Sequence, residues 1–195
     1  RSFYVLDNIA TLRQYGTMTK TDVQLFTPAE TIRGQSPARI DYFLKEQPKS
    51  LTLDILDGKG QVVRSFAGEP PPKPDPDGKP APAAEPGPRG PARTAPMAAG
   101  LNRFTWDLNS QPVVSFPGMI LWGAAQNGPM VLPGTYQVRL TVDGAPHTQS
   151  FAVIKHPLRN VSDADLLYQY ELARRIRDKV DEANNAVIRI RRMKS

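Results

Sequence analysis

Short segments in which apolar and polar residues alternate, or in which β-prone apolar residues cluster, cover much of the chain. A period of two residues is that of a β-strand with one buried face. The segments are 3–6, 22–26, 38–44, 51–56, 62–66, 102–108, 135–142 and 148–154. In 102–108 the alternation places Trp106 on the same side as Phe104 and Leu108. We therefore expect Trp106 in a hydrophobic core.

Turn-forming residues stand between several of these segments. The sequence Asp-Gly-Lys-Gly occupies 57–60, and Asp-Gly occupies 143–144. Glycine supplies the positive φ that tight hairpin turns need, so both sites predict β-hairpins. A series of short strands joined by such turns predicts a mainly β fold, an Ig-like antiparallel β-sandwich over residues 21–157.

Beyond residue 157 the apolar period lengthens to about 3.6 residues, the period of an α-helix. Ser162 followed by Asp165 is a variant of the helix capping box. Because no Gly or Pro interrupts the chain after this point, we expect a long C-terminal helix within 158–195. At ~1.5 Å per residue, such a helix is roughly 45 Å long, more than a small sandwich can cover.

One side of this expected helix carries apolar residues at alternating spacings of three and four. Such a heptad seam is typical of a helix that packs against another helix. The seam consists of Ala173, Ile176, Val180, Ala183, Val187 and Ile190. We expect it to contact a second helix or another copy of the chain, which makes a homo-oligomer one candidate assembly.

A proline-rich stretch divides the predicted sandwich. Eleven of the chain's 20 prolines fall between Pro70 and Pro96, among Ala, Gly, Lys and Asp. Proline lacks a backbone donor and the stretch has little apolar material to bury, so residues 68–99 are expected to form a disordered insertion. The cost of closing a loop rises only logarithmically with its length, which lets a sandwich accommodate it.

Composition narrows the possible partners. The formal net charge is +6 and the pI is near 9.7, but acidic residues lie among the basic ones, which favours a mixed-charge surface over a nucleic-acid site. There is no cysteine, which excludes disulfides, thiolate nucleophiles and cysteine-based zinc sites. No apolar run approaches the length that membrane insertion requires.

Candidate catalytic groups are few. His147 and His156 lack the spacing of a metal-binding pair, so neither a metal site nor a cofactor is predicted. Glycoside hydrolysis needs two carboxylates across a cleft. Asp57 is explained by its turn and Asp107 by hydrogen bonding at a strand end, while Asp54 occupies an outward-facing strand position. The sequence therefore predicts no catalytic residue in this chain.

Trp122 is the one residue singled out for ligand binding. It lies in the loop 116–123, between Pro/Gly-containing segments. An aromatic side chain in a loop can stack on a sugar ring, pack against a neighbouring domain or join the local core. All three interpretations stay open, and carbohydrate is a possible ligand.

Three motifs resemble the Ig-like domain of flagellar hook-capping proteins and its relatives. They are I-x-D-x-x-G-x-V-V-R at 55–64, G-x-N-x-x-x-W-D at 100–107 and P-G-x-Y-x-V-x-L at 133–140. Relatives with this domain often end large exported bacterial proteins. The resemblance implies a periplasmic or secreted location; the long proline-rich insertion departs from the pattern.

The first thirteen residues are similar to the last strand and exit segment of bacterial BNR-repeat, sortilin-like β-propeller proteins, often labelled glycosyl hydrolases. This resemblance implies that residues 1–20 close an upstream propeller and lead into the sandwich, and that the chain is part of a longer protein. The expected function is then a non-catalytic accessory module for interdomain packing or assembly. The alternatives are a fragment of a glycoside hydrolase whose active site lies in the propeller, and a carbohydrate-binding module.

Overall fold

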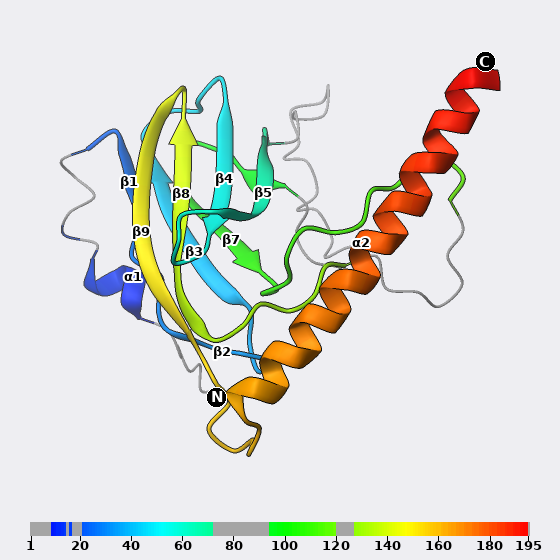
Figure 1. Ribbon diagram of the computed structural model, residues 1–195. Coiled ribbons are helices and arrows are strands. Elements are labelled where there is room, and N and C mark those ends of the chain that lie inside the picture. Colours follow the sequence, from blue (N-terminus) through cyan, green and yellow to red (C-terminus); the bar gives the residue numbers. More distant parts are fainter. Residues whose placement is uncertain (1–8, 15, 17–20, 72–93, 120–126, 195) are drawn as a thin grey trace, which may run out of the picture.

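The computed structural model describes residues 9–14, 16, 21–71, 94–119 and 127–194. In this part of the chain two β-sheets lie face to face and one long helix follows them (Figure 1). The protein is mainly β, an Ig-like antiparallel β-sandwich followed by a C-terminal α-helix, as the alternating pattern predicts. No helix among the described residues is both long and apolar enough to cross a lipid bilayer.

The two sheets differ in size. The smaller one is antiparallel and contains, in spatial order, β1 (Val23–Leu25), β3 (Ala38–Leu44) and β7 (Gly100–Trp106). The larger one contains, in spatial order, β2 (Thr31–Ile32), β9 (Ala145–Ile154), β8 (Gly134–Val142), β4 (Leu51–Leu56), β5 (Val62–Glu69) and β6 (Ala95–Pro96). Its outermost pairings, β2 with β9 and β5 with β6, are parallel, and the others are antiparallel.

Trp106 lies at the centre of the core between the sheets. It is fully buried, and its ring meets those of Tyr136 and Phe151 edge-on at 5.9 and 6.3 Å between centroids. Edge-to-face contact is a preferred geometry for aromatic pairs. The indole nitrogen donates a hydrogen bond of 2.9 Å to the carbonyl of Asn109, so burial leaves no polar atom of this side chain unpaired. The predicted core position of Trp106 is confirmed.

The two predicted hairpin turns are also present. Asp143 and Gly144 join β8 to β9 with φ of 47° and 88°, the two positive values of a type I′ turn. The Asp57 carboxylate accepts the backbone N–H groups of Lys59 and Gln61, each at 2.9 Å, and so fixes the turn between β4 and β5. The role assigned to Asp57 from the sequence is confirmed.

The proline-rich insertion is shorter than its composition indicates. Gly68, at the end of β5, pairs with Ala95 of β6, and both Ala95 and Met97 are buried. A Cβ on Gly68 would lie only 2.8 Å from Cβ of Leu51, so glycine is needed for this close approach. The predicted limits of 68–99 are therefore wrong at both ends, because Gly68 and Ala95 are small residues in a tightly packed strand pair rather than parts of the low-complexity stretch. Residues 72–93 lie outside the described residues.

The long helix α2 spans Asp163–Lys194 and begins as the sequence predicts. The Ser162 hydroxyl oxygen accepts the backbone N–H of Asp165 at 3.1 Å, and the same hydroxyl donates to the Asp165 carboxylate at 2.6 Å. Further along, α2 is held by the loop before β8. The Asn184 side chain donates to the Val114 carbonyl at 2.7 Å, and Asn184 is buried. The helix is thus tied to the sandwich through this loop, which runs beside it in Figure 1.

Alkaline unfolding is expected to follow ionisation of buried tyrosines. Burial raises the pKa of Tyr136 to about 12, and burial raises the pKa of Tyr42 as well. An exposed tyrosine in the unfolded chain has a pKa of about 10. Because both pKa values are higher in the folded state, the stabilisation is complete below pH ~10 and is lost as the pH rises through the folded values. Urea unfolding between pH 8 and 12 should show this loss.

The matched variant for this titration is Tyr136→Phe. It should be less stable at pH 8, since the Tyr136 hydroxyl donates to the Leu132 carbonyl at 2.8 Å, and its stability should fall less steeply with alkali than that of the wild type. An equally steep alkaline fall in both proteins would contradict the prediction.

Candidate functional site

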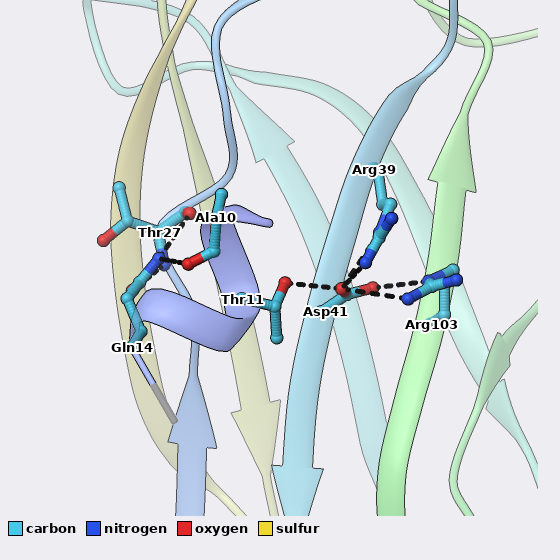
Figure 2. Close-up of polar contacts among 7 residues, drawn as sticks. All are labelled: Ala10, Thr11, Gln14, Thr27, Arg39, Asp41 and Arg103. Atoms are coloured by element: carbon cyan, nitrogen blue, oxygen red, sulfur yellow. Dashed lines mark hydrogen bonds and ion pairs between the residues drawn. The ribbon is translucent and has the colours of Figure 1, made fainter. Parts of the chain in front are cut away.

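A short N-terminal helix, α1 (Ala10–Arg13), lies against the outer face of the smaller sheet (Figure 2). Asp41 on this face binds the helix through the hydroxyl of Thr11. Alternation along β3 turns Ile40 and Tyr42 into the core and Asp41 to the opposite face. A carboxylate on an outer face is usually exposed, yet Asp41 is only 3% exposed. Neighbouring side chains therefore enclose it.

Three side chains bind the Asp41 carboxylate. Arg39 lies two residues earlier on the same face and donates to Oδ2 from Nε at 3.0 Å and Nη2 at 2.9 Å. Arg103 lies directly opposite on β7 and donates from Nε to Oδ1 at 2.9 Å. The third donor is the hydroxyl of Thr11 in α1, 2.6 Å from Oδ2. One carboxylate thus joins two strands of the sheet to the N-terminal segment.

These contacts keep Asp41 ionised. Burial by itself raises the pKa of the carboxyl group, but the hydrogen bonds from Arg39, Arg103 and Thr11 outweigh it and hold the pKa of Asp41 below its ordinary value. Charge-assisted bonds of this kind are stronger than neutral ones. The contribution to stability is therefore present above the unfolded carboxyl pKa of about 4 and is lost as the pH falls through the lower folded value.

Gln14 makes a second attachment just after α1. Its side-chain nitrogen donates to the carbonyls of Ala10 and Thr27, each at 3.1 Å. In return its side-chain oxygen accepts the backbone N–H of Thr27 at 2.9 Å. The Thr27 hydroxyl continues the chain of contacts by donating to Gln149 of β9 at 2.9 Å. Gln14 therefore pairs with the backbone of Thr27 as a neighbouring strand would, and Thr27 connects this pairing to the larger sheet.

We call this set the N-terminal dock, and its members are Thr11, Gln14, Thr27, Arg39, Asp41 and Arg103. It fixes the position and direction in which residues 9–14 run over the sheet. Ile9 and Leu12 remain 40% and 58% exposed on the docked segment. The arrangement is suited to holding a piece of backbone and presenting apolar side chains, because its carboxylate is enclosed by donors rather than open to a substrate.

The sequence did not predict the dock. Its only local signal is an acidic residue on the polar face of a strand, two residues after an arginine. Thr11 and Arg103, which bind Asp41, come from 30 and 62 residues away, and only the strand register and the path of the N-terminal segment bring them to it.

The carboxylates considered as a catalytic pair are each held by structural partners. Asp54, for which the sequence suggested only an outward-facing position, is buried; it accepts the Ser65 hydroxyl at 2.6 Å and Arg139 at 2.7 Å from the strands on either side. Asp107 accepts Arg64 at 2.9 Å, and Arg64 is itself buried. Hydrogen bonding near a strand end, expected for Asp107, is confirmed.

The remaining predicted site residues lie apart from the dock. Trp122 falls in 120–126, outside the described residues, so its three interpretations stay predictions. The six seam residues all lie on α2. Ala173, Val180 and Val187 are half-buried, whereas Ile176, Ala183 and Ile190 are exposed. Pairing of the seam with another helix also stays a prediction.

Metal-ligating side chains are dispersed. Among the residues that the structure describes, no three of His, Asp or Glu gather closely enough to hold a metal ion. The Nδ1 atom of His156 accepts the backbone N–H of Leu158 at 3.2 Å, which gives this ring a role in the turn before α2.

Comparison with known proteins gives only loose likenesses. No protein-family model matches the sequence, and no curated protein matches it. Among solved structures, the chain is similar to a biofilm associated protein, BSP domain, at 11% identity and a TM-score of 0.35; the match covers 67% of this chain and 15% of the other. It is also similar to CopC from Methylosinus trichosporium OB3b, at 18% identity and a TM-score of 0.33, over 72% and 99% of the two chains. Likenesses at this level carry no argument about function.

Proposed function

We propose that this chain is a non-catalytic accessory module that follows the β-propeller of an exported bacterial protein and fixes the position of that propeller. The observation that carries the proposal is the N-terminal dock. A segment that enters a domain through a mobile linker leaves the two domains free to move. Here the segment just before the sandwich is bonded to both the side chain of Asp41 and the backbone of Thr27.

The composition of the dock supports a structural role. Asp41 is enclosed by three donors, and Asp54 and Asp107 are paired within the sandwich. Each carboxylate thereby stabilises strand pairing or the docked segment. The exposed Ile9 and Leu12 are apolar side chains of the kind that an interdomain interface buries.

The exported, propeller-associated setting rests on the sequence motifs. The three Ig-like motifs resemble a domain that often ends large exported bacterial proteins, and the N-terminal segment resembles that of propeller proteins. The dock gives this segment a place to attach. In this proposal any sugar-handling chemistry belongs to the propeller. Assembly through the seam on α2 is a separate part of the proposal, supported by the exposure of Ile176 and Ile190 at 58% and 49%.

Limited proteolysis of the full-length protein tests the proposal. The double variant Thr11→Val, Gln14→Ala removes the side-chain bonds of the docked segment while leaving the sandwich core intact. We expect the junction, the chain that joins the propeller to the sandwich, to be cleaved at least ~10-fold faster in the double variant than in the wild type, because local opening exposes backbone to the protease. The control is Thr148→Val, which changes an exposed threonine on β9 and should cleave like the wild type.

Two results would contradict the proposal. One is a wild-type junction that is cleaved as fast as that of the double variant. The other is a gene that encodes no domain upstream of Arg1, because the proposal requires a propeller there.

A further inference from the structure

A groove of about 750 Å³ lies between the first turns of α2 and the end of the larger sheet. One side is formed by the segments after β2 and before β8, and the other by the segment after β9 and the start of α2. Sites for small molecules commonly have volumes of roughly 300 to 1,000 Å³ and combine an apolar lining with a few polar groups. The groove has the size of such a site, and it is separate from the N-terminal dock.

Two arginines give the groove its charge. Arg33 is held in place by its own hydrogen bonds, from Nε to the Val131 carbonyl at 2.8 Å and from Nη2 to the Met130 carbonyl at 3.4 Å. Arg159 comes from the segment after β9, and its Nη1 atom lies close to Gly34, 3.7 Å from where a Cβ would stand. Burial lowers the pKa of Arg33; Tyr136 acts in the opposite direction, and the positive charge of Arg159 adds to the lowering. The two positive charges therefore lie close enough to influence each other.

The nearby acids do not neutralise this pair. Among the described residues, neither Arg33 nor Arg159 has a carboxylate within ion-pair distance. Asp165 also lines the groove and brings one negative charge to it, and its carboxylate accepts the Ser162 hydroxyl in the helix cap. Asp163 pairs with Lys155 at 2.8 Å. Asp165 balances only one of the two positive charges, and the excess positive charge of the unpaired arginines favours the binding of an anion between them.

The rest of the lining is largely apolar. Met130 lies on the sheet side, and Leu166 and Ala173 lie on the helix side, one above the other at a spacing of seven residues. Tyr170 adds an aromatic ring on the same side of α2. Leu166 is buried, whereas Met130, Tyr170 and Ala173 are half-buried, so a ligand that carries an apolar group besides its charge would cover them further.

We propose that this groove binds a small molecule consisting of an oxyanion, either carboxylate or phosphate, attached to an apolar body. The oxyanion lies between Arg33 and Arg159, whose planar guanidinium groups fit both kinds of oxyanion. The apolar body contacts Met130, Leu166 and Tyr170. This inference is independent of the proposed function, since it uses neither the N-terminal dock nor an upstream domain.

Calorimetric titration of the wild-type chain tests the inference with simple probes. Phenyl phosphate and benzoate represent the two oxyanions on one apolar body, inorganic phosphate lacks the body, and benzyl alcohol lacks the charge. We expect saturable binding of phenyl phosphate, benzoate or both, and the stronger of the two identifies the oxyanion class. Inorganic phosphate and benzyl alcohol should each bind at least ~10-fold more weakly. If neither aromatic anion binds, or if inorganic phosphate binds as well as phenyl phosphate, the proposal is wrong.

Variants locate the binding. Arg159→Gln should weaken binding of the preferred probe by about 10-fold or more, because a charge-assisted contact is lost. Arg159→Lys should recover part of the lost affinity, since lysine keeps the positive charge but lacks the planar guanidinium that donates two parallel hydrogen bonds. The control is Arg175→Gln, which removes the same charge from an exposed site on the far side of α2. Equal affinity in Arg159→Gln and wild type, or an equal loss in the Arg175→Gln control, would overturn the assignment. Thermal melting verifies that each variant is folded.

Discussion

Replacing Trp106 by Ala is expected to lower the free energy of unfolding by about 4 kcal/mol, the largest loss anticipated for a single substitution in this chain. Trp106 is fully buried, and its ring contacts Tyr136 and Phe151 from the opposite sheet. Alanine would leave a cavity between the sheets and would remove the shorter of the two hydrogen bonds that the Asn109 carbonyl accepts, from Trp106 and Arg64, and both effects add to the lost burial. Urea unfolding followed by circular dichroism measures this loss.

Two further variants make the Trp106 result specific. Trp106→Phe retains most of the ring and should cost less than the alanine variant, although it also loses the hydrogen bond to Asn109. Leu101→Ala changes a 53% exposed residue on the same strand and should have a small effect. A loss below about 1 kcal/mol for Trp106→Ala would contradict a core built around this residue.

Asp41→Asn is expected to lower the free energy of unfolding by about 2 kcal/mol and to release residues 9–14 from the sheet. The variant keeps the shape of the side chain but removes the charge that Arg39 and Arg103 share. Their side chains are 22% and 52% exposed, so water compensates part of the loss, and the expected value lies below that for a fully buried ion pair. Urea unfolding at pH 7 measures the difference from the wild type.

The pH dependence separates this effect from a simple packing defect. Because the folded pKa of Asp41 is lowered, the advantage of the wild type should be complete well above pH 4 and should shrink as the pH falls below that value. The control is Asp22→Asn, which breaks an exposed pair with Lys45 and should cause a clearly smaller loss. A wild-type advantage over Asp41→Asn that is unchanged at pH 3 would contradict the account of the dock.

Much of the fold follows from local patterns. The alternation in 38–44 reproduces β3 residue for residue, and the Asp-Gly pair at 143–144 forms the predicted tight turn. Ser162 caps α2 as expected, and Trp106 is in the core. Each of these features depends on neighbours within a few residues, so the sequence carries the necessary information.

The missed features depend on distant neighbours. The two-residue strands β2 and β6 are too short for a period to be recognised, and each pairs in parallel with a strand far away in the sequence. The N-terminal dock requires the register between β3 and β7, which sets Arg103 opposite Asp41. Asp54 likewise had no predicted partner, although the same rule of cross-strand pairing gives it Arg139. Strand registers, rather than residue types, were the missing information.

Hydrogen exchange at the backbone amide of Thr27 tests the N-terminal dock most directly. Thr27 is exposed, and its N–H donates to the side chain of Gln14, so its protection reports whether the segment is attached. We predict exchange at least ~10-fold slower than in an unstructured chain for the wild type, and loss of this protection in Asp41→Asn and in Gln14→Ala. The amide of Gly60, bonded to Asp57 in the turn before β5, should be unaffected in all three proteins. Unprotected exchange of Thr27 in the wild type, or protection that survives Gln14→Ala, would contradict the central claim that the N-terminal segment is fixed to the sandwich.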